Sequence, residues 1–129
     1  MLLDTSFLID LMNGDEEAVE KAREFERDLV QQRLSAMTLF DLYYGIARAT
    51  DSASERETVE DVLASKPVSP ADTAVMRKAG RLAGDLQNDG TPVGDGDVII
   101  GATADILEEP VLTRNVADFD RLDVETETY

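Results

Sequence analysis

The chain has 129 residues, a formal net charge of −16 and 43% hydrophobic residues, which predicts one soluble globular domain over residues 1–129. It has no cysteine and no histidine, which excludes disulfides, thiol nucleophiles, Ser-His-Asp catalysis and the commonest zinc ligands. No apolar run approaches the roughly 18 residues of a membrane span, and the first expected strand leaves no room for a signal peptide, so we expect a cytoplasmic protein.

The first half of the chain alternates short apolar runs, which predict strands, with stretches of helical periodicity. Apolar residues spaced i, i+4, i+7 and i+11 predict a charged helix over residues 15–32, and Asn13-Gly14 separates it from the element before it. In chain order we expect a buried strand at 1–4, a helical turn or two in SFLIDLM, the helix at 15–32, a strand at 34–37 and helices at 38–49 and 53–64.

The second half continues the same alternation. Its clearest loop is NDGTPVGDGD, because glycine, proline and aspartate favour turns. In chain order we expect a brief strand or bend at 68, a helix at 70–88, this loop, an apolar central helix opened by Asp97, a buried strand at 111–113, a helix near 117–121 and a strand at 123–125. Short strands alternating with helices predict an α/β fold whose mainly parallel sheet is covered on both faces.

Four aspartates stand where strands hand over to helices: Asp4, Asp41, Asp97 and Asp118. In open parallel sheets, ligands bind outside the carboxyl ends of the strands, where the strand order reverses. Two charges about 4 Å apart repel by roughly 4 kcal/mol at an effective dielectric of 20, so such a cluster must hold a proton or bind a cation. Because no nitrogen or sulfur ligand is available, the pattern predicts a site for a hard cation such as Mg²⁺ or Mn²⁺.

Each aspartate alone also has a structural explanation. Asp4 and Asp97 have the positions of helix N-caps, whose side chains accept from free backbone N–H groups. Thr38 and Asp41 have the spacing of a capping box. Asp118 is explained equally well as a surface acid. The metal hypothesis therefore depends on the four side chains meeting in space.

The net charge of −16 is unusual for a protein that acts on nucleic acid, because basic surfaces normally attract phosphates. One interpretation is that the protein does not contact nucleic acid. The other is a surface adapted to high salt, where the Debye length falls to about 3 Å near 1 M and the repulsion is screened. Only three of the 12 basic residues are lysines, which favours the halophilic interpretation.

A few cationic and aromatic residues are candidates for RNA contacts. Arg48 and Arg114 are the main candidates for phosphate contacts, and Arg114 is nearest in sequence to an aspartate of the cluster. The alternative is that most of these arginines pair with neighbouring acids. Tyr43 and Tyr44 have faces that can stack on bases, although their apolar neighbours favour core or dimer contacts.

Four segments carry a family resemblance: MLLDTSFLIDLM, TLFDLYYGI, DVIIGATA and VLTRNVADF. In order and spacing they resemble the successive motifs of the PIN-domain family, and most closely the VapC-type ribonuclease toxins of toxin–antitoxin modules. The resemblance implies a three-layer α/β/α fold and a Mg²⁺- or Mn²⁺-dependent endoribonuclease. It also implies a homodimer and a cognate antitoxin that occludes the active site.

The resemblance also assigns roles to individual residues. Asp4 and Asp97 match positions that bind metal directly, and Asp41 and Asp118 match positions that complete the shell through water or a second ion. Polar positions that steady carboxylates or bound waters are matched by Thr5, Ser6, Thr113 and Asn115.

The chain departs from the family pattern at two of these positions. The second acid is usually glutamate, and Asp41 is one methylene shorter, so its contact with the metal would pass through a water. Some relatives carry the fourth acid at the position of Asn115 rather than Asp118. Asp95 competes with Asp97 for the third position, but the spacing to IIGATA favours Asp97.

Other classes of α/β protein fit less well. A receiver domain needs an acid pair near the first strand and a late lysine, and no lysine lies beyond residue 78. A haloacid-dehalogenase-type phosphatase needs D-x-D after the first strand, where this chain has Asp4-Thr5-Ser6. A catalytically weak PIN scaffold and a solitary RNA-processing nuclease remain the alternatives.

Overall fold

Five short strands form one parallel sheet in the order β3-β2-β1-β4-β5. The computed structural model describes residues 1–129. The strands are β1 (Leu2–Leu3), β2 (Arg33–Ser35), β3 (Val68–Ser69), β4 (Val111–Leu112) and β5 (Thr126–Glu127). The chain leaves β1 toward β2 and β3, and later returns to the other side of β1 as β4 and β5. The strand order therefore reverses at β1 and β4, which is where a parallel sheet offers a ligand site.

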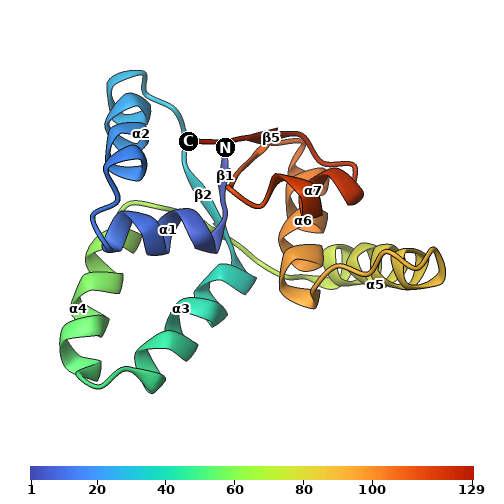
Figure 1. Ribbon diagram of the computed structural model, residues 1–129, viewed down its shortest axis with the longest axis horizontal. Helices are drawn as coiled ribbons and strands as arrows, with labels where there is room; N and C mark the ends of the chain where they lie inside the picture. Colours follow the sequence, from blue (N-terminus) through green and yellow to red (C-terminus); the bar gives the residue numbers. More distant parts are fainter.

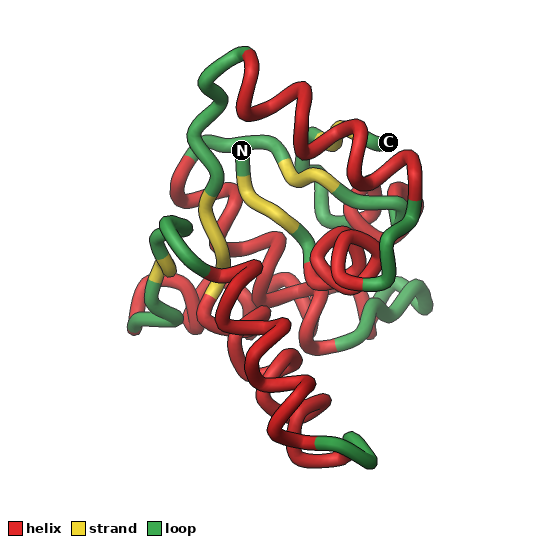
Figure 2. Tube along the Cα trace, turned by 90° about the vertical axis from the view of Figure 1, so that its left-hand side faces the viewer, coloured by secondary structure: helices red, strands yellow, loops and turns green.

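Seven helices cover the sheet: α1 (Thr5–Met12), α2 (Glu16–Arg27), α3 (Ala36–Arg48), α4 (Ser52–Leu63), α5 (Thr73–Asn88), α6 (Asp95–Leu107) and α7 (Val116–Arg121). Helices α1 to α4 lie on one side of the strands and α5 to α7 on the other, with α5 projecting as an arm (Figure 1). The tube in Figure 2 shows the short strands enclosed between red helices. None of the seven helices is both long and apolar enough to cross a membrane.

Two apolar cores, one on each face of the sheet, hold these layers together. Successive strand residues point to opposite faces, so Leu2 packs with α5, α6 and α7 while Leu3 packs with α1 to α4. Phe119 and Phe7 are the largest fully buried side chains of the two cores. The expected α/β fold, with a parallel sheet covered on both faces, is confirmed.

Some expected boundaries were wrong. The helix expected over 15–32 ends at Arg27, because the chain turns at Leu29, which has a φ of 55° and a side chain 90% exposed. The helix expected from residue 38 begins at Ala36, because the Ser35 hydroxyl accepts from the backbone N–H of Met37. The last strand lies at 126–127 instead of 123–125, after a turn in which Asp123 has a φ of 57°.

Candidate metal centre

The four aspartates come together at the carboxyl-end edge of the sheet. Asp4 follows β1, Asp41 lies on α3, Asp97 lies in the first turn of α6, and Asp118 in the first turn of α7. The charge of Asp4 raises the pKa of both Asp41 and Asp97, and the charge of Asp118 raises the pKa of Asp97. These shifts place the charges of Asp4 and Asp118 near Asp97, and that of Asp4 near Asp41.

Asp4 is the most buried of the four, with only 3% of its surface exposed. The hydroxyls of Ser6 and Thr113 both donate to its Oδ2, at 2.8 and 2.7 Å. Asp4 occupies the N-cap position of α1, but its side chain accepts no capping hydrogen bond from that helix. The capping explanation is therefore wrong for its carboxylate, and Oδ1 is left without a hydrogen bond inside the protein.

The side chain of Asp41, on α3, is hydrogen-bonded to a residue of α1. The Thr5 hydroxyl donates to its Oδ2 at 2.9 Å and also lies 3.1 Å from the hydroxyl of Thr38. The capping-box explanation fails because Ser35, not Thr38, is the N-cap of α3. Burial is the main cause that raises the pKa of Asp41, and the charge of Asp4 adds to it, while the hydrogen bond from Thr5 opposes both.

Asn115 joins the remaining two acids. Its Nδ2 donates to Oδ2 of Asp97 at 2.7 Å and to Oδ2 of Asp118 at 2.8 Å. Burial, followed by the charge of Asp4 and contact with Asp118, raises the pKa of Asp97 to about 6. The two candidates for the fourth position, Asn115 and Asp118, thus both lie in the cluster, with the amide bridging the acids.

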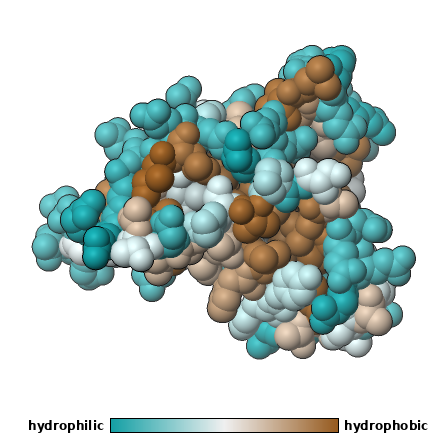
Figure 3. Space-filling model, turned by 180° about the vertical axis from the view of Figure 1, so that it is seen from behind, coloured by the Kyte–Doolittle hydropathy of each residue, from teal (hydrophilic) through white to brown (hydrophobic).

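The capping explanation for Asp97 is also wrong, because Gly94 is the N-cap of α6 and Asp97 lies within its first turn. Asp95 is exposed and lines a mainly apolar hollow between α5 and α6. Apolar side chains gather over this arm, on the left of Figure 3. Asp95 therefore lies on the surface between α5 and α6, whereas Asp97 is hydrogen-bonded to Asn115.

The helix ends around the cluster differ from the others. Four helices begin with a side chain that accepts from a first-turn N–H group: α2, α3, α4 and α5, capped by Asp15, Ser35, Asp51 and Asp72. Helices α1, α6 and α7, which begin at the cluster, have no side-chain cap. The partial positive charge of helix N-termini favours carboxylates nearby, so these ends offset part of the repulsion among the acids.

The donor set fits a hard divalent cation. It consists of carboxylate, hydroxyl and amide oxygens, which are the ligands of Mg²⁺ and Mn²⁺. No three acidic side chains are gathered closely enough to form a ready cage. Mg²⁺ needs only one or two carboxylates and keeps several waters, and Asp4 with Asp97 meets that requirement.

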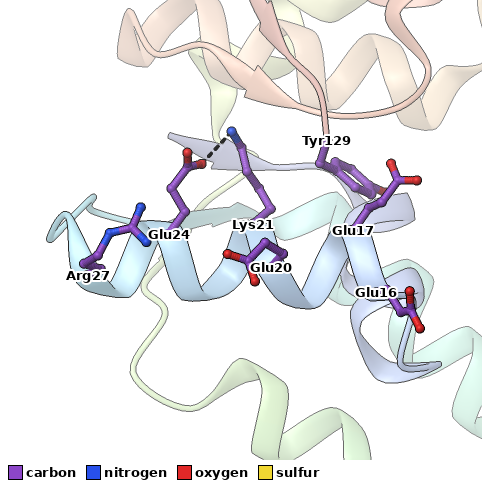
Figure 4. Close-up of a pocket in the computed structure, with 7 residues that line it drawn as sticks. All are labelled: Glu16, Glu17, Glu20, Lys21, Glu24, Arg27 and Tyr129. Carbon is purple, nitrogen blue, oxygen red and sulfur yellow. Dashed lines mark ion pairs between the residues drawn. The ribbon is translucent and has the colours of Figure 1, made fainter.

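The larger hollows of the surface lie elsewhere. One runs along α2 and is lined by Glu16, Glu17, Glu20, Lys21, Glu24, Arg27 and Tyr129 (Figure 4). Lys21 is paired there with Glu24 at 2.7 Å and with Glu127 at 2.6 Å. None of the four aspartates lines this hollow. The acid cluster is therefore identified as a candidate metal site by its oxygen ligands and not by the size of a cavity.

The two arginines expected to contact RNA have different environments. Arg114 pairs with Asp10 and Asp15, each at 3.1 Å, and its guanidinium lies over the ring of Tyr129, 4.4 Å from the ring centre. The hydrogen bond from Arg114 is the main cause that lowers the pKa of Asp15. This guanidinium is therefore engaged within the protein, which is the alternative that sequence reasoning left open. Arg48, in contrast, lies over Tyr44 without an ion pair.

The pKa of Asp97 predicts how stability depends on pH. The native carboxyl keeps its proton up to about pH 6, whereas the unfolded one loses it near pH 4. Asp97 therefore lowers the stability of the metal-free protein as pH rises from about 4 through 6. Because a cation replaces that proton, we expect Mn²⁺ to raise the melting temperature more at about pH 7.5 than at about pH 5. Thermal unfolding with and without Mn²⁺ checks this, and an equal gain at both pH values would contradict it.

Comparison with known proteins shows the family to which this fold belongs. The family model described as "PIN domain" matches residues 1–125. The "tRNA(fMet)-specific endonuclease VapC" of Salmonella typhimurium is 26% identical over 121 residues, covering 94% of this chain and 90% of the relative. "Ribonuclease VapC10" of Mycobacterium tuberculosis is 31% identical over 125 residues, covering 92% and 85%. The structure of DNA-bound VapBC from Salmonella typhimurium matches with a TM-score of 0.88 and 26% identity, covering 98% of this chain and 96% of that one.

Proposed function

Because this chain belongs to the PIN-domain family and to its VapC-type ribonuclease toxins, we propose that it hydrolyses RNA with a Mg²⁺ or Mn²⁺ ion bound by Asp4 and Asp97. The observation that supports the proposal is the placement of Asp4, Asp41, Asp97 and Asp118 at one edge of the sheet, where the charge of Asp4 raises the pKa of Asp41 and of Asp97. In a chain without histidine or cysteine, this cluster is the group of side chains best suited to phosphodiester chemistry.

The protein's own residues prepare the site. Ser6 and Thr113 fix Oδ2 of Asp4, and Asn115 fixes one oxygen each of Asp97 and Asp118. Asp4 and Asp97 each thereby keep a second oxygen for a cation or its waters, whereas the second oxygen of Asp118 accepts from Arg121 at 3.3 Å. A bound divalent cation supplies a Lewis acid that polarises a phosphoryl oxygen and stabilises the charge that develops there.

From the same family membership we propose two binding partners for this chain, an antitoxin and a second copy of itself. A cognate antitoxin binds it and occludes the acid cluster, as the VapC resemblance implies, and the matched Salmonella structure is a VapBC. A homodimer is the second expectation from the family. Action in the cytoplasm, where such an RNA substrate lies, follows from the same assignment.

The alternative is a catalytically weak PIN scaffold, which Asp41 favours because its side chain is one methylene shorter than the glutamate usual at this position. A solitary RNA-processing role is compatible with the same site and differs only in lacking an antitoxin. Metal-dependent cleavage separates the weak scaffold from the active enzyme.

RNA cleavage with added metal and with chelator tests the proposal. Purified protein is incubated with transfer RNA in about 1 M KCl, a concentration that screens its acidic surface. We expect cleavage with Mg²⁺ or Mn²⁺, loss of cleavage in excess EDTA, and recovery when Mn²⁺ is restored. Cleavage that continues unchanged in EDTA would refute the metal mechanism.

A further inference from the structure

The loop between β4 and α7 carries Arg114, whose side chain reaches two helices. Its Nη1 donates to Asp10 of α1 and to Asp15, the N-cap of α2, at 3.1 Å in each case, and its Nη2 donates to the other oxygen of Asp15 at 3.2 Å. Two parallel bonds between a guanidinium and one carboxylate fix the direction of the side chain as well as its charge. Arg114 therefore ties this loop to the start of α2 and to α1.

Tyr129 closes the same group from another side. Its ring lies 4.4 Å from the guanidinium of Arg114, and its hydroxyl donates to Asp10 at 2.6 Å. The ring also packs edge-on against the fully buried Phe7, with centres 5.0 Å apart. An exposed ion pair contributes little by itself, but a guanidinium held between two carboxylates and an aromatic face has little freedom to move. We call Asp10, Asp15 and Tyr129 the Arg114 anchor.

The residues on either side of Arg114 both donate to the acid cluster. The Thr113 hydroxyl donates to Asp4 at 2.7 Å, and the Asn115 amide donates to Asp97 at 2.7 Å. The Thr113 hydroxyl also accepts from the backbone N–H of Asn115 at 2.9 Å. Because adjacent Cα atoms stay 3.8 Å apart, a displacement of Arg114 moves both donors with it.

The local backbone does little to hold these donors in place. The loop follows β4, which has two residues, and precedes α7, which has six residues and no side-chain cap. Helices this short are not stable by themselves. The anchor at Arg114 thus supplies a restraint that the neighbouring secondary structure lacks.

We propose that Arg114 is a positioning residue, which through its anchor on α1 and α2 holds Thr113 and Asn115 where they orient the acids for a divalent cation. This inference rests on the proposed metal-dependent function and adds a residue outside the acid cluster that controls the affinity of the cluster for the ion.

Charge alone gives the opposite expectation. Removing a cation near an acidic site leaves that site more negative, which strengthens its attraction for a divalent cation. If Arg114 positions the donors, its removal instead weakens binding. The direction of the change therefore separates the two explanations.

The test measures Mn²⁺ binding to the full chain by electron paramagnetic resonance, in which the signal of the free aqueous ion falls as the ion binds. About 1 M KCl shortens the Debye length to about 3 Å and limits the effect of distant charges. Arg114→Gln should weaken Mn²⁺ binding about 3- to 10-fold, less than the about 10- to 100-fold typical of groups that bond a metal ligand directly. Asn115→Ala removes such a group and should give the larger loss. Tyr129→Leu removes the ring without a change of charge and should give a smaller loss in the same direction.

Arg33→Gln is the matched control for the loss of an ion pair. Arg33 begins β2 and pairs at 3.2 Å with Glu109, which lies just before β4, so this pair is at the amino ends of the strands. Its side chain is 31% exposed, against 39% for Arg114. Arg33→Gln should bind Mn²⁺ like the wild-type protein, and thermal unfolding of the same samples reports the loss of stability in each variant.

Mn²⁺ binding by Arg114→Gln that equals or exceeds that of the wild-type protein overturns the positioning role. An equal loss of binding in Arg33→Gln also overturns it, because the loss would then follow stability alone. If Arg114→Gln does not fold, Tyr129→Leu decides, and wild-type affinity in that variant overturns the role. Failure of the proposed function is a separate result: a wild-type protein that binds no Mn²⁺ overturns the metal mechanism and the positioning role together, whereas equal binding and cleavage by wild type and Arg114→Gln overturn the positioning role alone.

Discussion

Asp4→Asn and Asp97→Asn are each expected to lower the rate of RNA cleavage by about 100-fold or more, on the scale of losing one principal electrostatic group of an active site. Both substitutions keep the size of the side chain and remove only the charge that binds a cation. Asp97→Asn also removes a carboxylate whose ionised form is destabilised by burial and by repulsion from Asp4. Without metal, the Asp97→Asn variant should therefore unfold at the same temperature as the wild-type protein or at a higher one, although its activity is lower. Cleavage rates and thermal unfolding, measured on the same samples, check both parts.

Asp95→Asn is the matched control for this result. Asp95 lies two residues before Asp97 in the same first turn of α6, but it is exposed and faces the hollow beside α5. The Asp95→Asn variant should therefore cut RNA at the wild-type rate. Wild-type activity in Asp97→Asn, or equal losses in both variants, would show that the cluster is not the catalytic site.

Added KCl is expected to raise the melting temperature by on the order of 10 °C between low salt and about 2 M. The net charge of −16 on 129 residues repels itself in the folded state, and screening relieves that repulsion more in the compact chain than in the unfolded one. The ion pairs of the structure weaken in salt, but exposed ones such as Arg23–Glu20 and Arg27–Asp28 contribute little. Thermal unfolding in a KCl series measures the balance.

The shape of this salt dependence separates screening from a general exclusion effect. Screening should give most of the gain below about 0.5 M, where the Debye length changes fastest, whereas excluded solutes act steadily at high concentration. Sucrose, which carries no charge, is the control. A melting temperature that stays constant or falls as KCl is added would contradict the halophilic interpretation of the sequence.

The acid cluster could be predicted because local signals determined it. Each aspartate follows or adjoins a short apolar run, and in a parallel sheet such positions converge at one edge. The capping explanations were open until the hydrogen bonds of Asp4, Asp41 and Asp97 were known. The bridging role of Asn115 could not be predicted from the sequence. Asn115 and Asp118 were alternatives for the fourth acidic position, and nothing in the sequence indicated that the Asn115 amide would bind both Asp97 and Asp118.

The position of Arg114 could not be predicted, because its partners are remote in sequence. Asp10 and Asp15 precede it by about a hundred residues, and Tyr129, which donates from its hydroxyl to Asp10 at 2.6 Å, closes the group from the end of the chain. Such a cluster has no local periodicity or motif. Sequence reasoning missed Asp10 and Tyr129 for that reason, and it could only name Arg114 as a candidate RNA contact near the acid cluster while leaving open that it pairs with acids.

The first turns of the three helices without side-chain caps should be less stable than the first turns of the capped helices. A missing cap costs about 1 kcal/mol of helix stability, and α1, α6 and α7 all lack one at the ends that meet at the acids. Their first turns should open by local fluctuation more often than those of α2 to α5, so their amide hydrogens should exchange sooner with solvent. The side chains of Asp4 and Asn115, at the N-cap positions of α1 and α7, accept from no backbone N–H of those helices, and each is hydrogen-bonded to a residue outside its own helix, Asp4 to Thr113 and Asn115 to Asp97. Local rigidity at this edge is therefore incomplete until something binds there.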